Sequence, residues 1–220
     1  MTFENTTNPP ARPARIVVVG GVAGGMSCAA RARRLDESAE IIVLERGEYV
    51  SFANCGLPYY VGGEITDRRA LLVQTPQSLK ASLNLDVRIH HDVTGINATA
   101  HQVTVETPAG VQQIDYDALV LSPGAIAFRP SIEGIDSPRV RTLRTVDDAI
   151  ALRSGVEAGA KRAVVLGAGF IGLEAAEALA HQGLQTALVE LADHVLPPLD
   201  SEQASLVTDE LRRLGIAVHS

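Results

Sequence analysis

The sequence predicts an α/β protein whose chain contains the same strand–helix–strand pattern twice. The first copy occupies residues 15–45, where two short apolar runs flank a segment rich in Ala and Arg. The second copy occupies residues 162–190 and has the same order of segments. A parallel strand that is covered on both faces is a continuous apolar run, and all four runs have this pattern. An internal repeat of this kind predicts two Rossmann-like dinucleotide-binding units in one chain.

Each element of the first repeat follows from its composition. Residues 15–20 (RIVVVG) and 40–45 (EIIVLE) are β-branched runs and are expected to be buried strands. Residues 23–35 are expected to form a helix, because Ala and Arg have high helix propensity. A strand-rich, hairpin-like region should follow, with strands at 86–90, 102–106 and 118–121 and a closing turn at Ser122–Gly124.

The second repeat is expected to follow a connector and a helix. Residues 126–140 contain Pro130 and Pro138 and should be a connector without regular structure. The elements expected after it are a helix at 145–158, a strand at 162–166, a helix at 169–182, and strands at 186–190 and 215–219. A complete dinucleotide-binding half usually has further strands, so we expect the fold to be C-terminally incomplete at Ser220.

Composition and charge exclude several classes of partner. Hydrophobic residues make up 46% of the 220 residues, so a substantial core is expected. The net charge of −7 argues against binding to nucleic acid, which needs clustered Lys and Arg. No apolar run approaches the roughly 20 residues that cross a bilayer, so no membrane contact is expected. Residues 1–14 are polar and proline-rich and predict a disordered tail.

The cysteines and histidines favour a reducing compartment and no metal. Two cysteines cannot form a disulfide framework, which suits the cytoplasm. The six histidines are scattered, and none has the spacing of a metal ligand beside a cysteine or an acidic cluster. Cys28 lies among alanines in the first expected helix and is interpreted as a packing residue.

The second repeat contains the glycine pattern of a dinucleotide site, which we call the second glycine turn (residues 167–172). Gly167 would form the tight turn, Gly169 would let the backbone approach a pyrophosphate, and Gly172 would let the helix pack on the strand. The pyrophosphate would bind at the helix N-terminus, where unpaired N–H groups favour an anion. Glu190 ends the next strand, where its carboxylate would accept the ribose 2′-hydroxyl and repel a 2′-phosphate. This pattern favours NADH over NADPH.

The first repeat carries a weaker version of this pattern, which we call the first glycine turn (residues 20–25). Val22 occupies the position of the second glycine, so a side chain stands where the backbone would approach phosphate. Gly24 and Gly25 would relieve that crowding, and Glu45 ends the following strand at a suitable spacing for a ribose contact. The alternative is an ordinary turn between a strand and a helix. The presence of a second copy favours nucleotide binding.

The most informative stretch is SFANCGLPYYVGG, residues 51–63, which contains Cys55. No second cysteine lies four or five residues away, so this stretch does not contain a dithiol pair. A nucleophilic cysteine has to be deprotonated, and we expect a helix that begins around Gly56 and Pro58 to supply N–H donors that stabilise the thiolate. The alternative is an inert, buried cysteine.

Four stretches of the chain, in the same order, resemble the motifs of flavin-dependent pyridine nucleotide–disulfide oxidoreductases. They are VVVGGVAGG, SFANCGLPYYVGG, LVLSPGA and VVLGAGFIGLEAAE. The resemblance covers about residues 15–220. It is greatest to the single-cysteine branch, which includes coenzyme A-disulfide reductases, coenzyme A persulfide or polysulfide reductases, and NADH oxidases and peroxidases. The run NCGLPY favours the coenzyme A-linked members.

The resemblance implies two cofactors and a domain for each. Residues 15–140 would be the first part of an FAD-binding domain, and residues 141–220 an incomplete NAD(P)-binding domain. Proteins of this branch are usually homodimers, in which tyrosines from the partner's interface domain reach the site. The resemblance therefore implies a homodimer that uses FAD and NAD(P)H. The cysteine count suits the cytoplasm, and Glu190 makes NADPH less favourable than NADH.

The resemblance also assigns roles to individual residues. Those implied to contact FAD are Gly20, Val22, Ala23, Gly24, Glu45, Arg46, Val93, Ser122 and Gly124. Those implied for the nicotinamide site are Gly167, Gly169, Phe170, Ile171, Gly172, Glu174 and Glu190. Phe170 would be an aromatic gate over the flavin and Glu174 a carboxylate that points toward it; core packing and a surface charge are the respective alternatives.

Substrate contacts are implied for Ser27, Arg31, Arg34, Ser51 and Asn54. Arg31 and Arg34 are three residues apart on one helix face and would bind coenzyme A phosphates. The alternative is a solvated basic face. Where some members of the branch have Lys, this chain has Leu83, with Lys80 three residues earlier.

Cys55 would be the redox residue. By resemblance, NADH and FAD supply the electron pair, and the Cys55 thiolate attacks a disulfide or persulfide whose second sulfur belongs to the substrate. Two alternatives stay open. One is an NADH oxidase or peroxidase in which Cys55 cycles through a sulfenic acid, and the other is a non-catalytic nucleotide-binding fragment.

Overall fold

The computed structural model describes residues 12–220, which divide into two compact units. The first unit contains the chain up to residue 52 together with residues 74–125, and the second contains residues 53–73 and 126–220. The second unit therefore holds Cys55 and the second glycine turn, whereas the first glycine turn belongs to the first unit. The domain boundary predicted between residues 140 and 141 stays a prediction.

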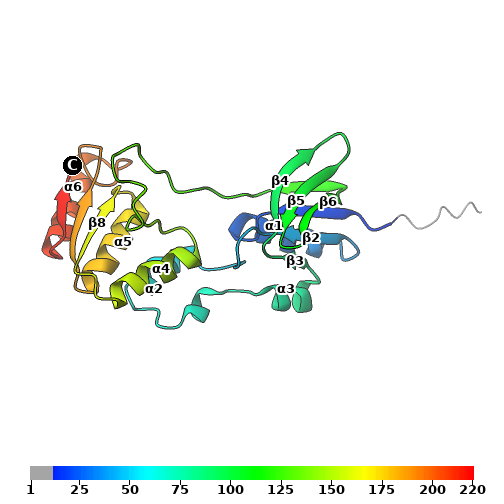
Figure 1. Ribbon diagram of the computed structural model, residues 1–220, viewed down its shortest axis with the longest axis horizontal. Helices are drawn as coiled ribbons and strands as arrows, with labels where there is room; N and C mark the ends of the chain where they lie inside the picture. The colour runs from blue at the N-terminus through cyan, green and yellow to red at the C-terminus, as the bar shows by residue number, and fades with distance from the viewer. Residues whose placement is uncertain (1–11) are drawn as a thin grey trace, which may run out of the picture. The chain divides into compact units, whose positions relative to one another are not determined.

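The first unit is built on a four-stranded parallel sheet in the order β3-β2-β1-β7 (Figure 1). Its strands are β1 (Arg15–Val19), β2 (Glu40–Leu44), β3 (Asp86–Arg88) and β7 (Ala118–Leu121), with α1 (Ala23–Leu35) between β1 and β2 and α3 (Pro76–Leu83) before β3. These elements confirm the predicted strands and the predicted helix. Their ends differ from the prediction by no more than two residues.

Neighbouring residues of β1 and β2 face opposite sides of this sheet, as the twofold period of a strand requires. On one side, Val18 and Val43 pack in a buried cluster with Met26 of α1. On the other side, Val17 and Ile42 pack in a buried cluster with side chains from a second, antiparallel sheet. The parallel sheet is thus covered on both faces at β1 and β2, which is why these two strands are apolar after their first residues.

The antiparallel sheet consists of β4 (Asp92–Asn97), β5 (Gln102–Thr107) and β6 (Gly110–Asp115), in sequence order. It confirms the strand-rich, hairpin-like region that the sequence predicts. Only β5 matches a strand that was predicted individually. In β6 a single residue, Ile114, is buried, so this strand lacks the apolar alternation by which it would be recognised.

The second unit has a three-stranded parallel sheet in the order β10-β9-β8. Its elements are α4 (Val146–Glu157), β8 (Arg162–Leu166), α5 (Phe170–His181), β9 (Gln185–Val189), α6 (Ser201–Arg213) and β10 (Ala217–His219). All except α6 were predicted. The core of this sheet and its helices includes Ala176, Leu188 and Ile216. The connector predicted at 126–140 is confirmed, because the structure has no helix or strand there.

Residues 53–65, which we call the cysteine segment, belong to the second unit. They form a short 3-10 turn, η1 (Asn54–Gly56), and the helix α2 (Leu57–Val61), and a second 3-10 turn, η2 (Arg68–Leu71), follows. The predicted helix start beside Gly56 and Pro58 is confirmed. Helix α2 packs on both α4 and α5 (Figure 1). Its residues Leu57, Pro58 and Val61 are buried.

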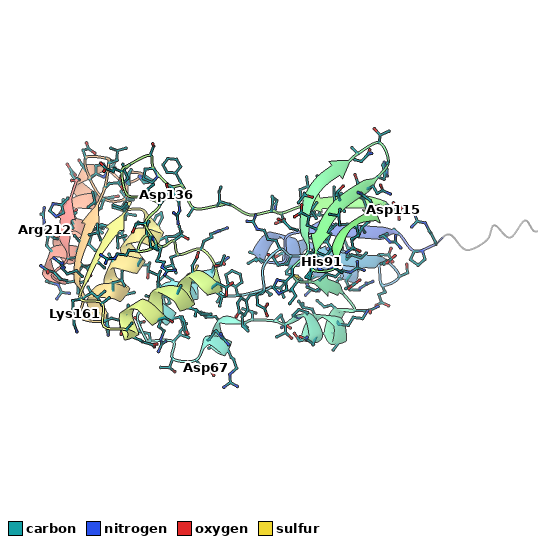
Figure 2. The ribbon with its side chains drawn as sticks, in the orientation of Figure 1. Asp67, His91, Asp115, Asp136, Lys161 and Arg212 are labelled. Atoms are coloured by element: carbon teal, nitrogen blue, oxygen red, sulfur yellow. The ribbon has the colours of Figure 1, made fainter. Side chains whose placement is uncertain are left out.

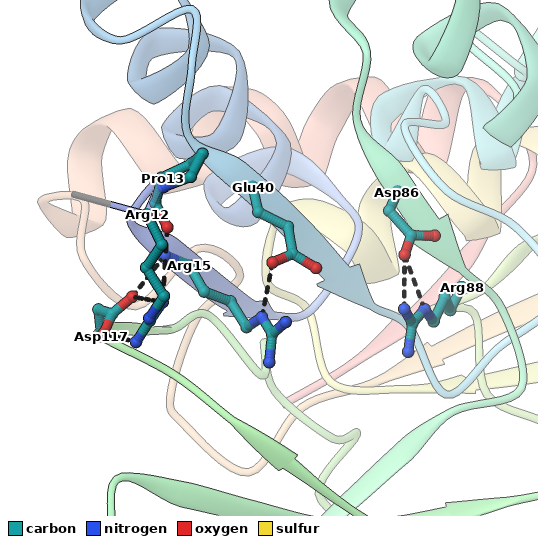
Figure 3. Close-up of polar contacts among 7 residues, drawn as sticks. All are labelled: Arg12, Pro13, Arg15, Glu40, Asp86, Arg88 and Asp117. Atoms are coloured by element: carbon teal, nitrogen blue, oxygen red, sulfur yellow. Dashed lines mark hydrogen bonds and ion pairs between the residues drawn. The ribbon is translucent and has the colours of Figure 1, made fainter. Parts of the chain in front are cut away.

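The amino ends of the strands in the first unit carry several exposed ion pairs (Figure 3). Arg12 binds Asp117 through both of its terminal guanidinium nitrogens, at 2.7 and 2.6 Å, and Arg15 binds Glu40 at 2.7 Å. Exposed pairs of this kind contribute little stability, so the apolar core holds the sheet together. Of the tail predicted at 1–14, residues 1–11 lie outside the described residues.

Residues 12–220 contain neither a membrane-spanning helix nor a cluster of metal ligands. In this part of the chain, no helix combines the length and the apolar character needed to cross a membrane. Nor do any three His, Cys, Asp or Glu side chains of these residues group in a way that would hold a metal ion. Most charged side chains lie on the surface, among them the labelled Asp67, Asp115, Lys161 and Arg212 (Figure 2).

Candidate functional site

The two glycine turns have the same backbone geometry. Gly20 and Gly167 have φ angles of +100° and +97°, a left-handed conformation that favours glycine. Their N–H groups donate to the last residue of the following strand, Leu44 and Val189 respectively, each at 2.8 Å. The structure therefore confirms the repeat that the sequence predicts, and it shows that the two copies also share equivalent backbone hydrogen bonds.

The third glycine of each pattern lies directly under the turn. A Cβ atom placed on Gly25 would lie 1.8 Å from the carbonyl oxygen of Gly20, and one placed on Gly172 would lie 1.9 Å from that of Gly167. No side chain fits at such distances. These glycines allow the helix to start against the turn, as the sequence pattern predicts.

A carboxylate closes each turn from the end of the second strand. Glu45 accepts hydrogen bonds from the N–H groups of Gly21 at 2.7 Å and Gly47 at 2.8 Å. Glu190 accepts from Ala168 at 2.6 Å and from Ala192 at 3.0 Å, and also from Leu191. Because each carboxylate oxygen has two lone pairs, both residues retain acceptor capacity for a ribose hydroxyl. The ribose contacts themselves stay predictions.

The structure shows a further repeated contact that the sequence did not reveal. The N–H of Ser51 donates to the carbonyl of Gly21, and the N–H of Leu196 donates to the carbonyl of Ala168, both at 2.9 Å. Ser51 and Leu196 both have left-handed backbones, with φ angles of +46° and +49°. A serine and a leucine share no side-chain chemistry, so no sequence signal could have identified this pair.

The two turns differ in what surrounds them. In the first turn, a Cβ on Gly20 would lie 2.0 Å from the Ser122 carbonyl oxygen, and one on Gly24 would lie 2.4 Å from the Ser122 hydroxyl. The structure thus places Ser122 against the first turn, and its contact with FAD stays a prediction. In the second turn, a Cβ on Gly167 or Gly169 would meet no heavy atom of the described residues within 4 Å. The backbone there is open to the close approach of a ligand.

Other predicted residues of the first unit lie on exposed surfaces or in the core. Ser27, Arg31 and Arg34 lie on one exposed face of α1, as their spacing of four and three residues requires. Arg46 is exposed next to Glu45. Val93 packs against the core between the two sheets, so any adenine contact would come from its backbone.

Cys55 is exposed and free, whereas Cys28 is only partly accessible within α1. Cys55 lies in η1, immediately before α2, and Asn54 precedes it in the same turn. The structure therefore excludes the alternative of a buried Cys55. Ser51, also predicted to lie near the sulfur, belongs to the first unit.

The predicted residues of α5 lie on two successive turns of that helix. Phe170 and Ile171, at its start, are 68% and 58% exposed, so the core-packing alternative for Phe170 is excluded. Glu174 lies one turn later and close to Tyr59 of the cysteine segment. The negative charge of Glu174, together with hydrogen bonding between the two side chains, raises the pKa of the Tyr59 hydroxyl. Glu174 thus contacts α2, which the sequence did not predict.

The hydrogen bonds to Glu190 should make the free energy of unfolding depend on pH. Hydrogen bonds from the N–H groups of Ala192 and Ala168 lower its pKa below the ordinary value of 4.5. Because the folded pKa is depressed, the stabilisation is fully present above pH 4.5 and is lost as the pH falls through the folded pKa. At pH 7 we expect the free energy of unfolding of Glu190→Gln to be about 1–2 kcal/mol lower than that of the wild type. Urea unfolding would measure this difference.

The difference between Glu190→Gln and the wild type should shrink as the pH is lowered below 4.5. Glu133→Gln is the matched control, because Glu133 is exposed in the connector, and it should unfold like the wild type at every pH. A difference for Glu190→Gln that stays constant down to pH 3.5, roughly a unit below the ordinary glutamate pKa, would contradict this role.

Known proteins with similar sequences and structures include several reductases. The coenzyme A disulfide reductase of Staphylococcus haemolyticus is 38% identical over 200 residues, which are 90% of this chain and 45% of that protein. The structure of reduced Bacillus anthracis CoADR-RHD superimposes with a TM-score of 0.91 at 44% identity, over 94% of this chain and 38% of that one. The chain therefore spans less than half the length of these proteins.

Two further solved structures are similar over nearly the whole chain. An NAD-dependent persulfide reductase from A. fulgidus gives a TM-score of 0.90 at 40% identity, over 93% of this chain and 38% of that one. A water-forming NADH oxidase from Lactobacillus brevis, bound to NADH, gives 0.88 at 31% identity, over 94% of this chain and 46% of that one.

These similarities agree with the match to a family model. The model describes pyridine nucleotide-disulphide oxidoreductases and matches residues 14–220. The matched region includes both glycine turns and the cysteine segment. Proteins of this family use FAD and a pyridine nucleotide. From its sequence and its fold, the chain belongs to the pyridine nucleotide-disulphide oxidoreductase family.

Proposed function

We propose that this chain is the nucleotide-binding and cysteine-bearing part of an FAD- and NADH-dependent reductase of coenzyme A disulfide, persulfide or polysulfide. The observation that carries this proposal is the exposed, unpaired Cys55 in a unit that also contains the second glycine turn. The names of the similar reductases support a sulfur substrate.

The second glycine turn would hold NADH. Its backbone N–H groups at the start of α5 would bind the pyrophosphate, and the open space over Gly167 and Gly169 would allow that approach. The lowered pKa keeps Glu190 ionised at neutral pH. Its carboxylate would then accept the ribose 2′-hydroxyl and repel the 2′-phosphate of NADPH.

The first turn would hold FAD. Glu45 keeps acceptor capacity for a ribose hydroxyl, and Gly20 and Gly24 pack closely against Ser122, another proposed contact. Val22, Ala23, Arg46, Val93 and Gly124 complete the proposed contacts. FAD bound there would supply the two-electron transfer from NADH that reduces a disulfide on Cys55.

Cys55 would perform the sulfur chemistry. Its thiolate would attack one sulfur of coenzyme A disulfide, form a mixed disulfide, and release the other coenzyme A as a thiolate. Two electrons from NADH would then cleave the mixed disulfide, restore the Cys55 thiolate and release the second thiol. One disulfide, one NADH and one proton would give two thiols and NAD⁺. Ser27, Arg31, Arg34, Ser51 and Asn54 are the proposed substrate contacts.

An anaerobic titration of the purified full-length protein with NADH tests this function. We expect bound flavin to be bleached by NADH, and NADH oxidation to continue only when coenzyme A disulfide is added, with two thiols released per NADH. The thiols would be measured with a chromogenic disulfide reagent after NADH is exhausted. No flavin absorbance in the purified protein would support a non-catalytic fragment instead.

The similarity to an NADH oxidase supports a second candidate. In that reaction Cys55 would cycle through a sulfenic acid. Rapid NADH oxidation with oxygen or hydrogen peroxide, with no response to coenzyme A disulfide, would favour it. For either function we propose a cytoplasmic homodimer.

A further inference from the structure

We infer that Arg153 of α4 is a positioning residue for Cys55, because it fixes the end of the short helix that follows the cysteine. This inference deepens the proposed function and rests on it for the role of the thiol. It concerns contacts within the second unit alone. Neither the glycine patterns nor the motifs around Cys55 include Arg153.

Arg153 makes several contacts with the cysteine segment. Its Nη1 atom donates to the carbonyl oxygens of Tyr60, at 3.0 Å, and Ile65, at 2.9 Å. The guanidinium carbon lies 4.7 Å from the centre of the Tyr60 ring, over its face. The Nε atom is held by Glu157 at 2.8 Å, and the Arg153 side chain is only 20% exposed. One guanidinium therefore binds the segment by two hydrogen bonds and a ring contact.

These contacts act where α2 is weakest. A helix of five residues, Leu57–Val61, cannot be stable alone, and the last carbonyl groups of any helix lack partners within it. The Tyr60 carbonyl in that last turn accepts a long hydrogen bond from the N–H of Gly63, at 3.3 Å, and Arg153 supplies it with a second, shorter one. Its positive charge also interacts favourably with the negative end of the helix dipole. Cys55 lies two residues before α2, so the helix determines where the thiol stands.

Other contacts hold α2 in place without Arg153. Leu57, Pro58 and Val61 are buried, and Gln182 of α5 donates through Nε2 to the carbonyl of Gly62. The loss of Arg153 should therefore loosen the segment without unfolding the unit. That expectation separates a positioning role from a purely structural one.

The test compares Arg153→Met and Arg153→Lys in the full-length holoprotein with Arg212→Met as control. Arg212 lies on the exposed surface of α6 (Figure 2). Its ion pair with Asp209 is long, at 3.6 Å. The measurements are the rate of Cys55 alkylation by iodoacetamide from pH 5 to 9, a range of about two units around neutrality, followed by peptide mass mapping. The kcat and KM for coenzyme A disulfide and the rate of flavin reduction by NADH are measured on the same samples.

For Arg153→Met we expect kcat to fall about 10- to 100-fold, because a misplaced nucleophile loses its alignment. The alkylation profile of Cys55 should change with it, whereas the rate of flavin reduction by NADH should not. Arg153→Lys should recover part of the loss, since an ammonium supplies hydrogen bonds without the planar fork. Arg212→Met should match the wild type in every measurement.

An Arg153→Met protein with wild-type kcat and an unchanged alkylation profile would overturn the inference. If that variant does not fold, Arg153→Lys and Tyr60→Leu decide: a wild-type alkylation profile in both would overturn it as well. The alkylation measurement needs no coenzyme A disulfide. If the wild type fails to reduce that substrate but Arg153→Met still alters alkylation, the proposed function is wrong and the positioning role stands.

Discussion

Cys55→Ser is expected to lower the turnover of coenzyme A disulfide by on the order of 1,000-fold or more, while flavin reduction by NADH continues. The reason is that a serine hydroxyl does not form a disulfide and is hardly ionised near neutral pH. Cys55 is exposed at the start of the cysteine segment, so the smaller serine should not disturb the packing of α2. Stopped-flow absorbance would follow the reduction of the flavin, and thiol release would follow turnover.

Cys28→Ser is the matched control, because the chain contains only these two cysteines. Cys28 lies within α1 and is partly buried, so the variant should keep wild-type turnover with a small loss of stability. Undiminished turnover in Cys55→Ser would refute the role of that residue. Equal losses in both variants would indicate a general disturbance of the protein.

Gly172→Ala and Gly169→Ala are expected to have opposite effects on stability and binding. The added methyl group at Gly172 would lie 1.9 Å from the Gly167 carbonyl oxygen, so α5 would have to move away from the turn. We expect a loss of about 1–3 kcal/mol in the free energy of unfolding, as for other overpacked sites. The methyl group at Gly169 would meet no other heavy atom of residues 12–220 within 4 Å, and its φ of −76° suits alanine.

Gly169→Ala should therefore keep its stability but bind NADH about 10-fold or more weakly, which corresponds to about 1.4 kcal/mol. The methyl group would occupy the space through which a pyrophosphate approaches the backbone. Urea unfolding measures the first quantity, and the NADH dependence of the flavin reduction rate measures the second. Normal NADH affinity in Gly169→Ala would remove the second glycine turn from the proposed nucleotide site.

The parallel strands β1, β2, β8 and β9 were predictable because each contains a short run of apolar or β-branched residues. In β2 this run is buried, whereas in β8 Val164 and Leu166 are exposed, so the run indicates a strand without showing that both faces are covered. Residues 40–44 and 162–166 are examples, and the structure confirms both as strands. Strands β4 and β6 and helices α3 and α6 were not predicted. In α6 only Ala204 and Leu211 are buried, so few of its residues show on which side the core lies.

The glycine turns were predictable for a related reason. A left-handed turn and a closely packed helix both exclude side chains, so the requirement appears directly as glycine at 20, 25, 167 and 172. The helix that begins just after Cys55 also follows from the local pattern, whereas the exposure of Cys55 was left open by the sequence and came from the structure. In both predicted cases the residue type itself carries the structural constraint.

The sequence alone therefore determined the two repeats, their glycine turns and the helix start after Cys55, because each depends on neighbours close along the chain. Only the tertiary structure decided that the cysteine segment packs on α4 and α5, and that Ser51 and Leu196 both bind the glycine turns. Arg153 binds carbonyl groups 93 and 88 residues away. Every residue has a carbonyl group, so a contact of this kind leaves no mark in the sequence and exists only once the chain has folded.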